Sequence, residues 1–167
     1  MLQGRWRDRR RAGPVLVVAL TCGLVAGSVA AAPHQSLVVT DDDGRVLARL
    51  ALAESGTFSL RYRNSLYGTL AEERFTIDGE RFRLDELAAE QLAVLEEYYT
   101  VVEAPIRAGT DWYQAPPAYE LELERLTVAA TELGERTILV EGQSPLPLRT
   151  LVGAAGPFVH VEVVRGP

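Results

Sequence analysis

The sequence predicts a mainly β protein: a single antiparallel β-sandwich with one short helix, preceded by an N-terminal signal or anchor helix. Short segments in which apolar and polar residues alternate recur roughly every 8–12 residues, as sandwiches require. Turn-forming residues separate these segments. Hydrophobic residues make up 47% of the chain and charged residues 24%, which suits a globular core and argues against disorder. The 167 residues therefore divide into a segment 1–32 and a sandwich domain 33–167.

Residues 1–32 have the pattern of an export signal. Five arginines lie near the start, the 19 residues from Pro14 to Ala32 carry no charge, and Ala30-Ala31-Ala32 fits a signal-peptidase site. An uncleaved anchor is the alternative, since 19 residues can just span a bilayer, but the many small residues favour cleavage. Both interpretations place the domain across the cytoplasmic membrane, in the periplasm or on the extracytoplasmic face, either free or membrane-anchored.

Eight segments of the domain are predicted to be strands, because each contains β-forming residues that alternate or form a short apolar run. In chain order they are Ser36–Thr40, Arg45–Leu52, Thr57–Ser65, Arg74–Ile77, Glu80–Leu84, Tyr119–Leu123, Thr137–Val140 and Phe158–Val164. The third is the clearest, since its alternation places Phe58, Leu60 and Tyr62 on one face. In the last strand, alternate valines face inward and His160 faces outward.

Two turns between these strands are predicted from their residue types. Asp41-Asp42-Asp43-Gly44 is typical of a hairpin loop that ends in glycine. Asp78-Gly79 favours the positive φ angles of a type I′ turn. This second turn would place Phe75 opposite Phe82 as a cross-strand aromatic pair.

The segment Asp85–Glu97 interrupts the strand pattern and is predicted to be the short helix. It is rich in helix-forming residues and contains neither glycine nor proline. Asp85 can cap its first turn. The residues that share its apolar face are Leu84, Ala88, Leu92 and Leu95. A loop with aromatic residues, Pro105–Pro117, follows farther along the chain.

Composition excludes several function classes. Residues 1–32 hold five of the 17 basic and one of the 23 acidic residues, which leaves 12 and 22 in the domain and a net charge of −10. Nucleic acid is therefore excluded as a partner, because phosphate binding needs a basic face. The chain has no lysine, which rules out Schiff-base and P-loop chemistry. Cys22 is the only cysteine and lies before the domain, which excludes a disulfide or a thiol nucleophile there.

Neither a cofactor nor a metal site is predicted. The three aspartates of the turn Asp41–Gly44 could bind calcium, but the ligand spacing and the distal glutamate of an EF-hand are missing, which favours a solvated turn. His34 and His160 are the only histidines, and they show neither HxH nor HExxH spacing.

An enzymatic function is the alternative to a binding function. A Ser–His–Asp triad could combine Ser65, His160 and Asp111, but the G-x-S-x-G turn of hydrolases is absent from the sequence. The alternative is therefore a hydrolase or metal-dependent enzyme that uses His160 with Ser65 or Glu162. A non-enzymatic function is preferred because no recognisable catalytic constellation occurs.

A ligand site is predicted where the polar strand end Arg61–Ser65 meets the loop Pro105–Pro117. Arginine binds carboxylates in a bidentate manner, which points to a small organic acid, although surface pairing of the arginines with acidic residues is the commoner arrangement. Aromatic side chains of the loop would cover the apolar part of the ligand, or else plug the open end of the sandwich. The predicted site residues are Arg61, Arg63, Asn64, Ser65, Tyr99, Trp112 and Tyr113.

The segment LRYRNSLYGTLAEERFTIDG (Leu60–Gly79) resembles the signature of a small exported bacterial family called domain of unknown function 1850. The matching positions are Leu60, Tyr62, Ser65, Thr69, Glu73 and Phe75. The chain departs from the family at Asn64, where members have histidine, and in a later glycine-containing loop. The ending Leu146–Val163, with His160, is again similar, so the resemblance covers most of the domain.

The resemblance implies export, a β-sandwich and a link to solute uptake, because members commonly lie beside TRAP-type transporter permeases. The resemblance implies neither an enzymatic reaction nor a catalytic residue. We therefore expect an exported non-enzymatic accessory or binding module whose partners are a transporter membrane subunit and a small organic acid.

Overall fold

A computed structural model describes residues 35–108, 111–153 and 156–166. The predicted signal or anchor segment, its cleavage site, Cys22 and His34 lie outside these residues. In the part of the chain that is described, no helix is both long and apolar enough to cross a membrane.

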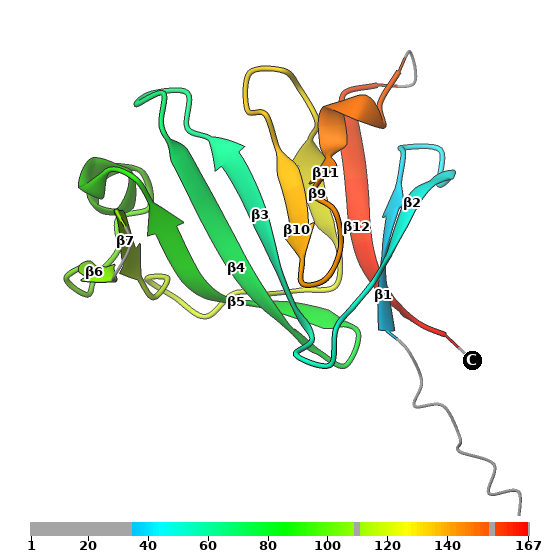
Figure 1. The fold of residues 1–167 in the computed structure, drawn as a ribbon, viewed down its shortest axis with the longest axis horizontal. Coiled ribbons are helices and arrows are strands. Elements are labelled where there is room, and N and C mark those ends of the chain that lie inside the picture. The colour runs from blue at the N-terminus through cyan, green and yellow to red at the C-terminus, as the bar shows by residue number, and fades with distance from the viewer. Residues whose placement is uncertain (1–34, 109–110, 154–155, 167) are drawn as a thin grey trace, which may run out of the picture. The chain divides into compact units, whose positions relative to one another are not determined.

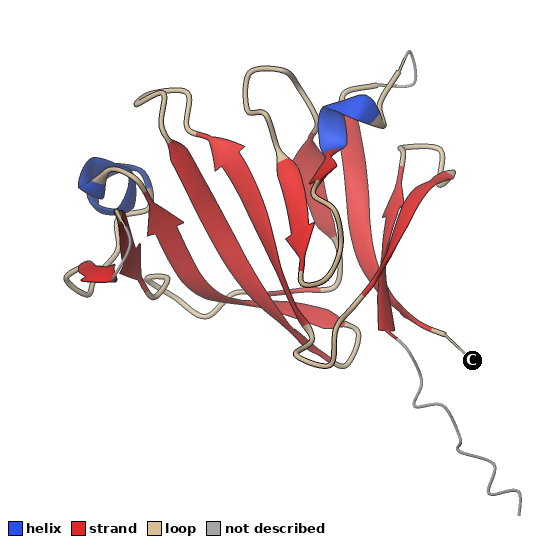
Figure 2. Cartoon of the chain, in the orientation of Figure 1, coloured by secondary structure: helices blue, strands red, loops and turns tan. Residues whose placement is uncertain are grey.

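The described residues form two antiparallel sheets with very little helix, which confirms the predicted mainly β fold (Figures 1 and 2). The smaller sheet has the order β2-β1-β12-β9, and the larger has the order β11-β10-β3-β4-β5-β7-β6, with β8 paired to β5. The strands of the smaller sheet are β1 (Gln35–Thr40), β2 (Val46–Ala51), β9 (Leu126–Ala129) and β12 (Phe158–Arg165). Those of the larger sheet are β3 (Thr57–Arg63), β4 (Leu70–Asp78), β5 (Arg81–Ala89), β6 (Ile106–Ala108), β7 (Trp112–Ala115), β8 (Glu122–Leu123), β10 (Thr137–Val140) and β11 (Leu146–Pro147). The helical elements are η1 (Val94–Tyr98) and η2 (Leu148–Thr150).

One hydrophobic core unites the inner faces of both sheets, as a sandwich requires. The alternation predicted for β3 and β12 is confirmed, because the apolar residues of each strand are buried on one face. Three phenylalanines form the aromatic part of the core: the ring of Phe58 stacks on Phe75 at 5.0 Å and meets Phe82 edge-on at 5.3 Å.

The predicted register of the β4–β5 hairpin is wrong. Asp78 pairs with Arg81, so that Gly79 and not Asp78 is the first central residue of the turn, with a φ of 67°. A type II′ turn gives glycine this position. Phe75 consequently lies opposite Leu84, although its ring still contacts that of Phe82 edge-on at 6.4 Å.

The predicted helix Asp85–Glu97 is also wrong in its first part. Its first five residues belong to β5, and the helical element η1 is a π-helix over Val94–Tyr98. Leu87, Ala88 and Ala89 are all buried, so both faces of this strand are covered. Burial of both faces and pairing with β4 outweigh the helix propensity of the segment, which is a weak preference.

The loop predicted over Pro105–Pro117 contains the hairpin of β6 and β7. In the predicted strand Tyr119–Leu123, only Glu122–Leu123 pairs, at β8. The glutamates near β8, at positions 120, 122 and 124, are exposed.

Candidate functional site

Three segments come together at one end of the larger sheet: the β3–β4 loop, the π-helix η1 and the β9–β10 loop. The backbone N–H of Arg63 donates to the carbonyl of Gly134 at 2.8 Å, which ties the end of β3 to the β9–β10 loop. The hydroxyl of Tyr67 donates to Glu97 at 2.6 Å, which ties the β3–β4 loop to η1. The two loops lie at the top of Figure 1, whereas the β4–β5 hairpin lies at the bottom.

A carboxylate lies on the inner face of the sheet near this end. Glu73 of β4 is opposite Leu60 and Leu87, which are both buried core residues. Directly opposite residues of antiparallel strands share a face, so Glu73 points toward the core, where carboxylates are rare. The hydroxyl of Tyr99 donates to Glu73 at 2.6 Å, and the hydroxyl of Tyr62 lies 2.5 Å from that of Tyr99. The three side chains form one hydrogen-bonded chain.

Burial changes the acidity of all three groups. Burial raises the pKa of Glu73, and the hydrogen bond from Tyr99 and the nearby charge of Arg136 offset this shift only in part. Burial is also the main cause of the raised pKa of Tyr62 and of Tyr99, and the charge of Glu73 raises both further. Both phenols therefore keep their protons at neutral pH and serve as hydrogen-bonding groups.

A cavity of about 70 Å³ adjoins this chain, and two guanidinium groups line it. Arg63 is paired with Glu135 at 3.1 Å. Arg136 lies over the ring of Tyr62 at 5.9 Å and donates to the carbonyl of Ala129 at 3.0 Å, but forms no ion pair with a described residue. Its cation is therefore available to an anion that enters the cavity.

Backbone strain is concentrated beside the same side chains. Among the described residues, Thr100 with φ 52° and Glu135 with φ 46° are the only residues other than glycine with positive φ. Thr100 directly follows Tyr99, and Glu135 directly precedes Arg136. Such outliers and π-helices both cluster at functional sites. Within the described ranges, the hydroxyl of Thr69 is also the one buried polar side-chain atom without a hydrogen-bond partner, and it lies in the β3–β4 loop.

The predicted site residues Arg63, Asn64 and Ser65 line this cavity together with Tyr98, and Tyr99 lies beneath it through its bond to Tyr62. Asn64 is buried, and its side-chain oxygen accepts hydrogen bonds from the backbone of Leu66 and Tyr67, which shapes the loop.

Arg61 and Trp112 lie on the outer face of the larger sheet. Arg61 is opposite Glu72 and forms an ion pair with it at 2.5 Å. Arg74 forms ion pairs with Glu72 and Glu86. The guanidinium of Arg61 also lies 5.8 Å from the ring of Trp112. The arginines thus pair with glutamates across the sheet, which was the alternative to an anion site, although Glu72 itself is buried.

Tyr113 belongs to neither group. It packs against the core, and the guanidinium of Arg107 lies 5.5 Å from its ring. The residues predicted to form one site therefore lie in three places: the cavity, the outer face and the core.

Sequence reasoning missed Glu73 and Arg136 as site residues. A signal for Glu73 existed, because Ala71, Glu73 and Phe75 alternate on the face that Phe75 marks as buried. Tyr62 and Glu73 also stand at matching positions of the family signature. No comparable signal marks Arg136, whose place depends on the β9–β10 loop.

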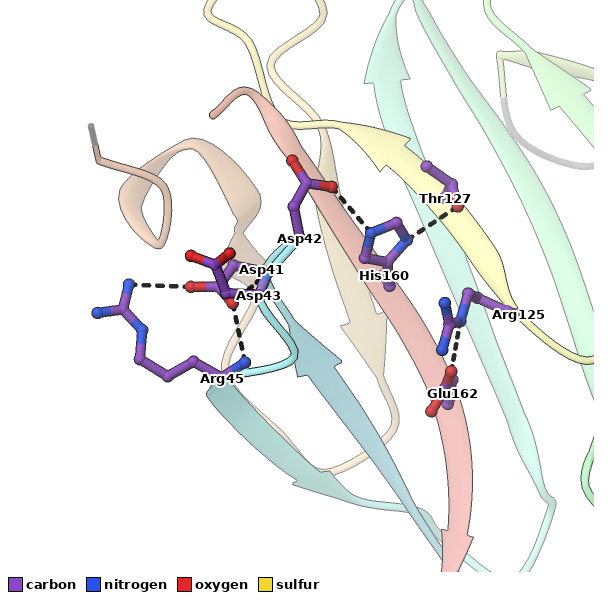
Figure 3. Close-up of polar contacts among 8 residues, drawn as sticks. All are labelled: Asp41, Asp42, Asp43, Arg45, Arg125, Thr127, His160 and Glu162. Carbon is purple, nitrogen blue, oxygen red and sulfur yellow. Dashed lines mark hydrogen bonds and ion pairs between the residues drawn. The ribbon is translucent and has the colours of Figure 1, made fainter. Parts of the chain in front are cut away.

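His160 has other neighbours than the enzyme alternative requires. Figure 3 shows its two ring nitrogens bound to Thr127 and to Asp42, each at 3.0 Å. Glu162 pairs with Arg125. Ser65 lies in the β3–β4 loop, attached to the other sheet.

The other residues considered for catalysis or metal binding also have structural partners. Asp111 pairs with Arg107 at 3.3 Å. A carboxylate oxygen of Asp41 accepts hydrogen bonds from the backbone of Asp43 and Arg45, so the acidic segment is a turn as predicted (Figure 3). The described residues contain no group of three potential metal ligands.

A scan against protein-family models finds no match for this chain, and searches of the curated proteins and of the solved structures find none either.

Proposed function

We propose that this chain is an exported, non-enzymatic binding module that holds a small organic acid in the cavity at the loop end of the larger sheet. The observation that carries the proposal is Arg136: its guanidinium lines the cavity and forms no ion pair with a described residue, although its charge acts on the nearby Glu73. Such a group binds a carboxylate strongly when the surroundings are partly shielded from water.

The neighbouring side chains suit the same ligand. Ser65 and Tyr98 line the cavity and offer hydroxyl groups, and Tyr62 below them stays protonated. Because burial favours the neutral form of Glu73, this carboxyl opposes an incoming anion less than a fully ionised one would. Arg61, the arginine favoured by the sequence, is engaged by Glu72 instead.

The test compares two arginines in the full-length chain. Titration calorimetry with small carboxylates is expected to give saturable binding to the wild type. Arg136→Gln removes a charged hydrogen-bonding partner. This loss costs about 1.5–3 kcal/mol of binding free energy and so raises Kd about 10- to 100-fold. Arg61→Gln, on the outer face, is the matched control and should leave Kd unchanged. Equal losses in both variants, or no saturable binding, would contradict the proposal.

The link to a transporter rests on the family resemblance alone. We propose that a TRAP-type membrane subunit is the partner of the exported chain. Affinity purification of the tagged full-length chain from native membranes is expected to recover that subunit, in excess over a purification with the same tag on an unrelated exported domain. Recovery of soluble proteins alone would count against the link.

A further inference from the structure

Large apolar side chains surround the cavity on the solvent side. Leu66 of the β3–β4 loop is 74% exposed, Leu133 of the β9–β10 loop 72%, and Tyr98 of η1 54%. Tyr98 and Leu133 line the cavity itself, and Leu66 directly follows the lining residue Ser65. Exposed apolar side chains of two segments, Tyr98 and Leu133, thus form a rim on one polar hollow, and the exposed Leu66 lies one residue from its lining. Exposed apolar patches of this kind mark places where a ligand or partner is bound.

The size of the cavity limits what can enter it. The cavity is small, at about 70 Å³. That space suits the carboxylate end of an organic acid, whereas the chain of a longer acid extends beyond it. The remainder of any ligand held by Arg136 must lie outside the cavity, against the apolar rim.

The charges near the rim disfavour a second negative group on the ligand. The segments that carry the rim also carry Glu96, Glu97 and Glu132, all of which are exposed. The whole domain has an excess of acidic residues, and a field of that sign repels multiply charged anions more strongly than singly charged ones.

We infer that the ligand is an amphipathic monocarboxylate, an aliphatic or aromatic acid whose carboxylate meets Arg136 and whose apolar part covers Leu66, Tyr98 and Leu133. Dicarboxylates and sugar acids are disfavoured, because they would place charge or hydroxyl groups on the apolar rim. This inference rests on the proposed function and specifies its substrate class.

The test is a calorimetric series on the full-length chain with acetate, butyrate, hexanoate, octanoate and benzoate, and with succinate as the dicarboxylate. Affinity is expected to rise about two- to four-fold for each added methylene, the upper value being that of a methylene wholly removed from water. Succinate is expected to bind more weakly than butyrate, which has the same number of carbon atoms.

Two variants distinguish the contribution of the rim to binding from that of the cavity. Leu66→Ser with Leu133→Ser changes only exposed side chains, so folding is little affected, and should flatten the dependence of affinity on chain length. Gly134→Ala would bring its Cβ within 2.4 Å of Arg136 Nη1 and displace the guanidinium, and should weaken every acid by a similar factor.

The outcomes distinguish this inference from the proposed function. Binding of acetate with no dependence on chain length, or tighter binding of succinate than of butyrate, would overturn the inference and leave the proposed function standing. If no acid in the series binds, both are overturned.

Discussion

Phe82→Ala is expected to destabilise the domain by about 3–5 kcal/mol, the usual cost of removing a buried phenylalanine ring. Phe82 is 0% exposed, contacts the rings of Phe58 and Phe75, and lies opposite Ile77 and Leu123. Strands on both sides hold these neighbours in place, so the space left by the ring cannot collapse easily. The free energy of unfolding by denaturant measures the effect.

Phe158→Ala is the matched control, since it removes the same side chain from a strand position that is 44% exposed. Its effect should stay within about 0.5–1 kcal/mol, as for most surface substitutions. Equal effects of the two substitutions would show that the cluster of three phenylalanines is not the centre of the core.

Glu73→Gln is expected to change how stability depends on pH. The pKa of Glu73 is raised in the folded state, mainly by burial, so the folded chain binds a proton more tightly than the unfolded chain. The stabilisation from the neutral carboxyl is complete below the unfolded pKa of about 4.3 and is lost as pH rises through the folded pKa. Glutamine stays neutral and keeps an oxygen that can accept from Tyr99, so the variant escapes this loss.

The stability of Glu73→Gln relative to the wild type should therefore increase from about pH 4 to pH 7, by about 1.4 kcal/mol for each unit by which the pKa is raised. Tyr99→Phe supplies the opposite change. It removes the hydrogen bond that lowers the pKa of Glu73, so the total loss of stability with pH should become larger and continue to higher pH. Unfolding curves of the three proteins at several pH values measure this. Parallel pH profiles of wild type and Glu73→Gln would contradict the interpretation.

The strands were predictable where alternation of apolar and polar residues within the segment itself marks them. Phe58, Leu60 and Tyr62 reveal β3 because side chains alternate with period 2 in any half-buried strand. The hairpin register was not predictable, because both Asp78-Gly79 and Gly79-Glu80 offer a glycine to the turn and the choice depends on pairing along the whole of β4 and β5.

The false helix has a related cause. The residues of Asp85–Ala89 favour helix when taken alone. They form a strand because they are paired on one side with β4, the other strand of the hairpin, and on the other side with β7, which is distant in sequence. Propensity describes the isolated chain, whereas the sheet decides the outcome here.

The candidate site was predictable only in outline. The polar end of β3 was recognised because arginine, asparagine and serine are gathered at the end of an otherwise apolar strand. The ion pair between Arg61 and Glu72 was not predictable, because it depends on which residue of β4 lies opposite Arg61. Arg136 reaches the cavity through the β9–β10 loop, whose path is set by the bond between Gly134 and Arg63.

The two ends of the described domain have a consequence for protein engineering. Gln35 and Arg165 are directly paired, and the side chain of Gln35 donates to the carbonyl of Gly79, at the end of the molecule opposite the cavity. Paired residues lie about 4.5–5.5 Å apart, so a linker of a few glycines could join these ends. New termini could then be opened in the exposed turn 141–144 after β10, also remote from the cavity. Such a circular permutant, or an insertion of the domain into a host protein, would present the end with the cavity outward and intact.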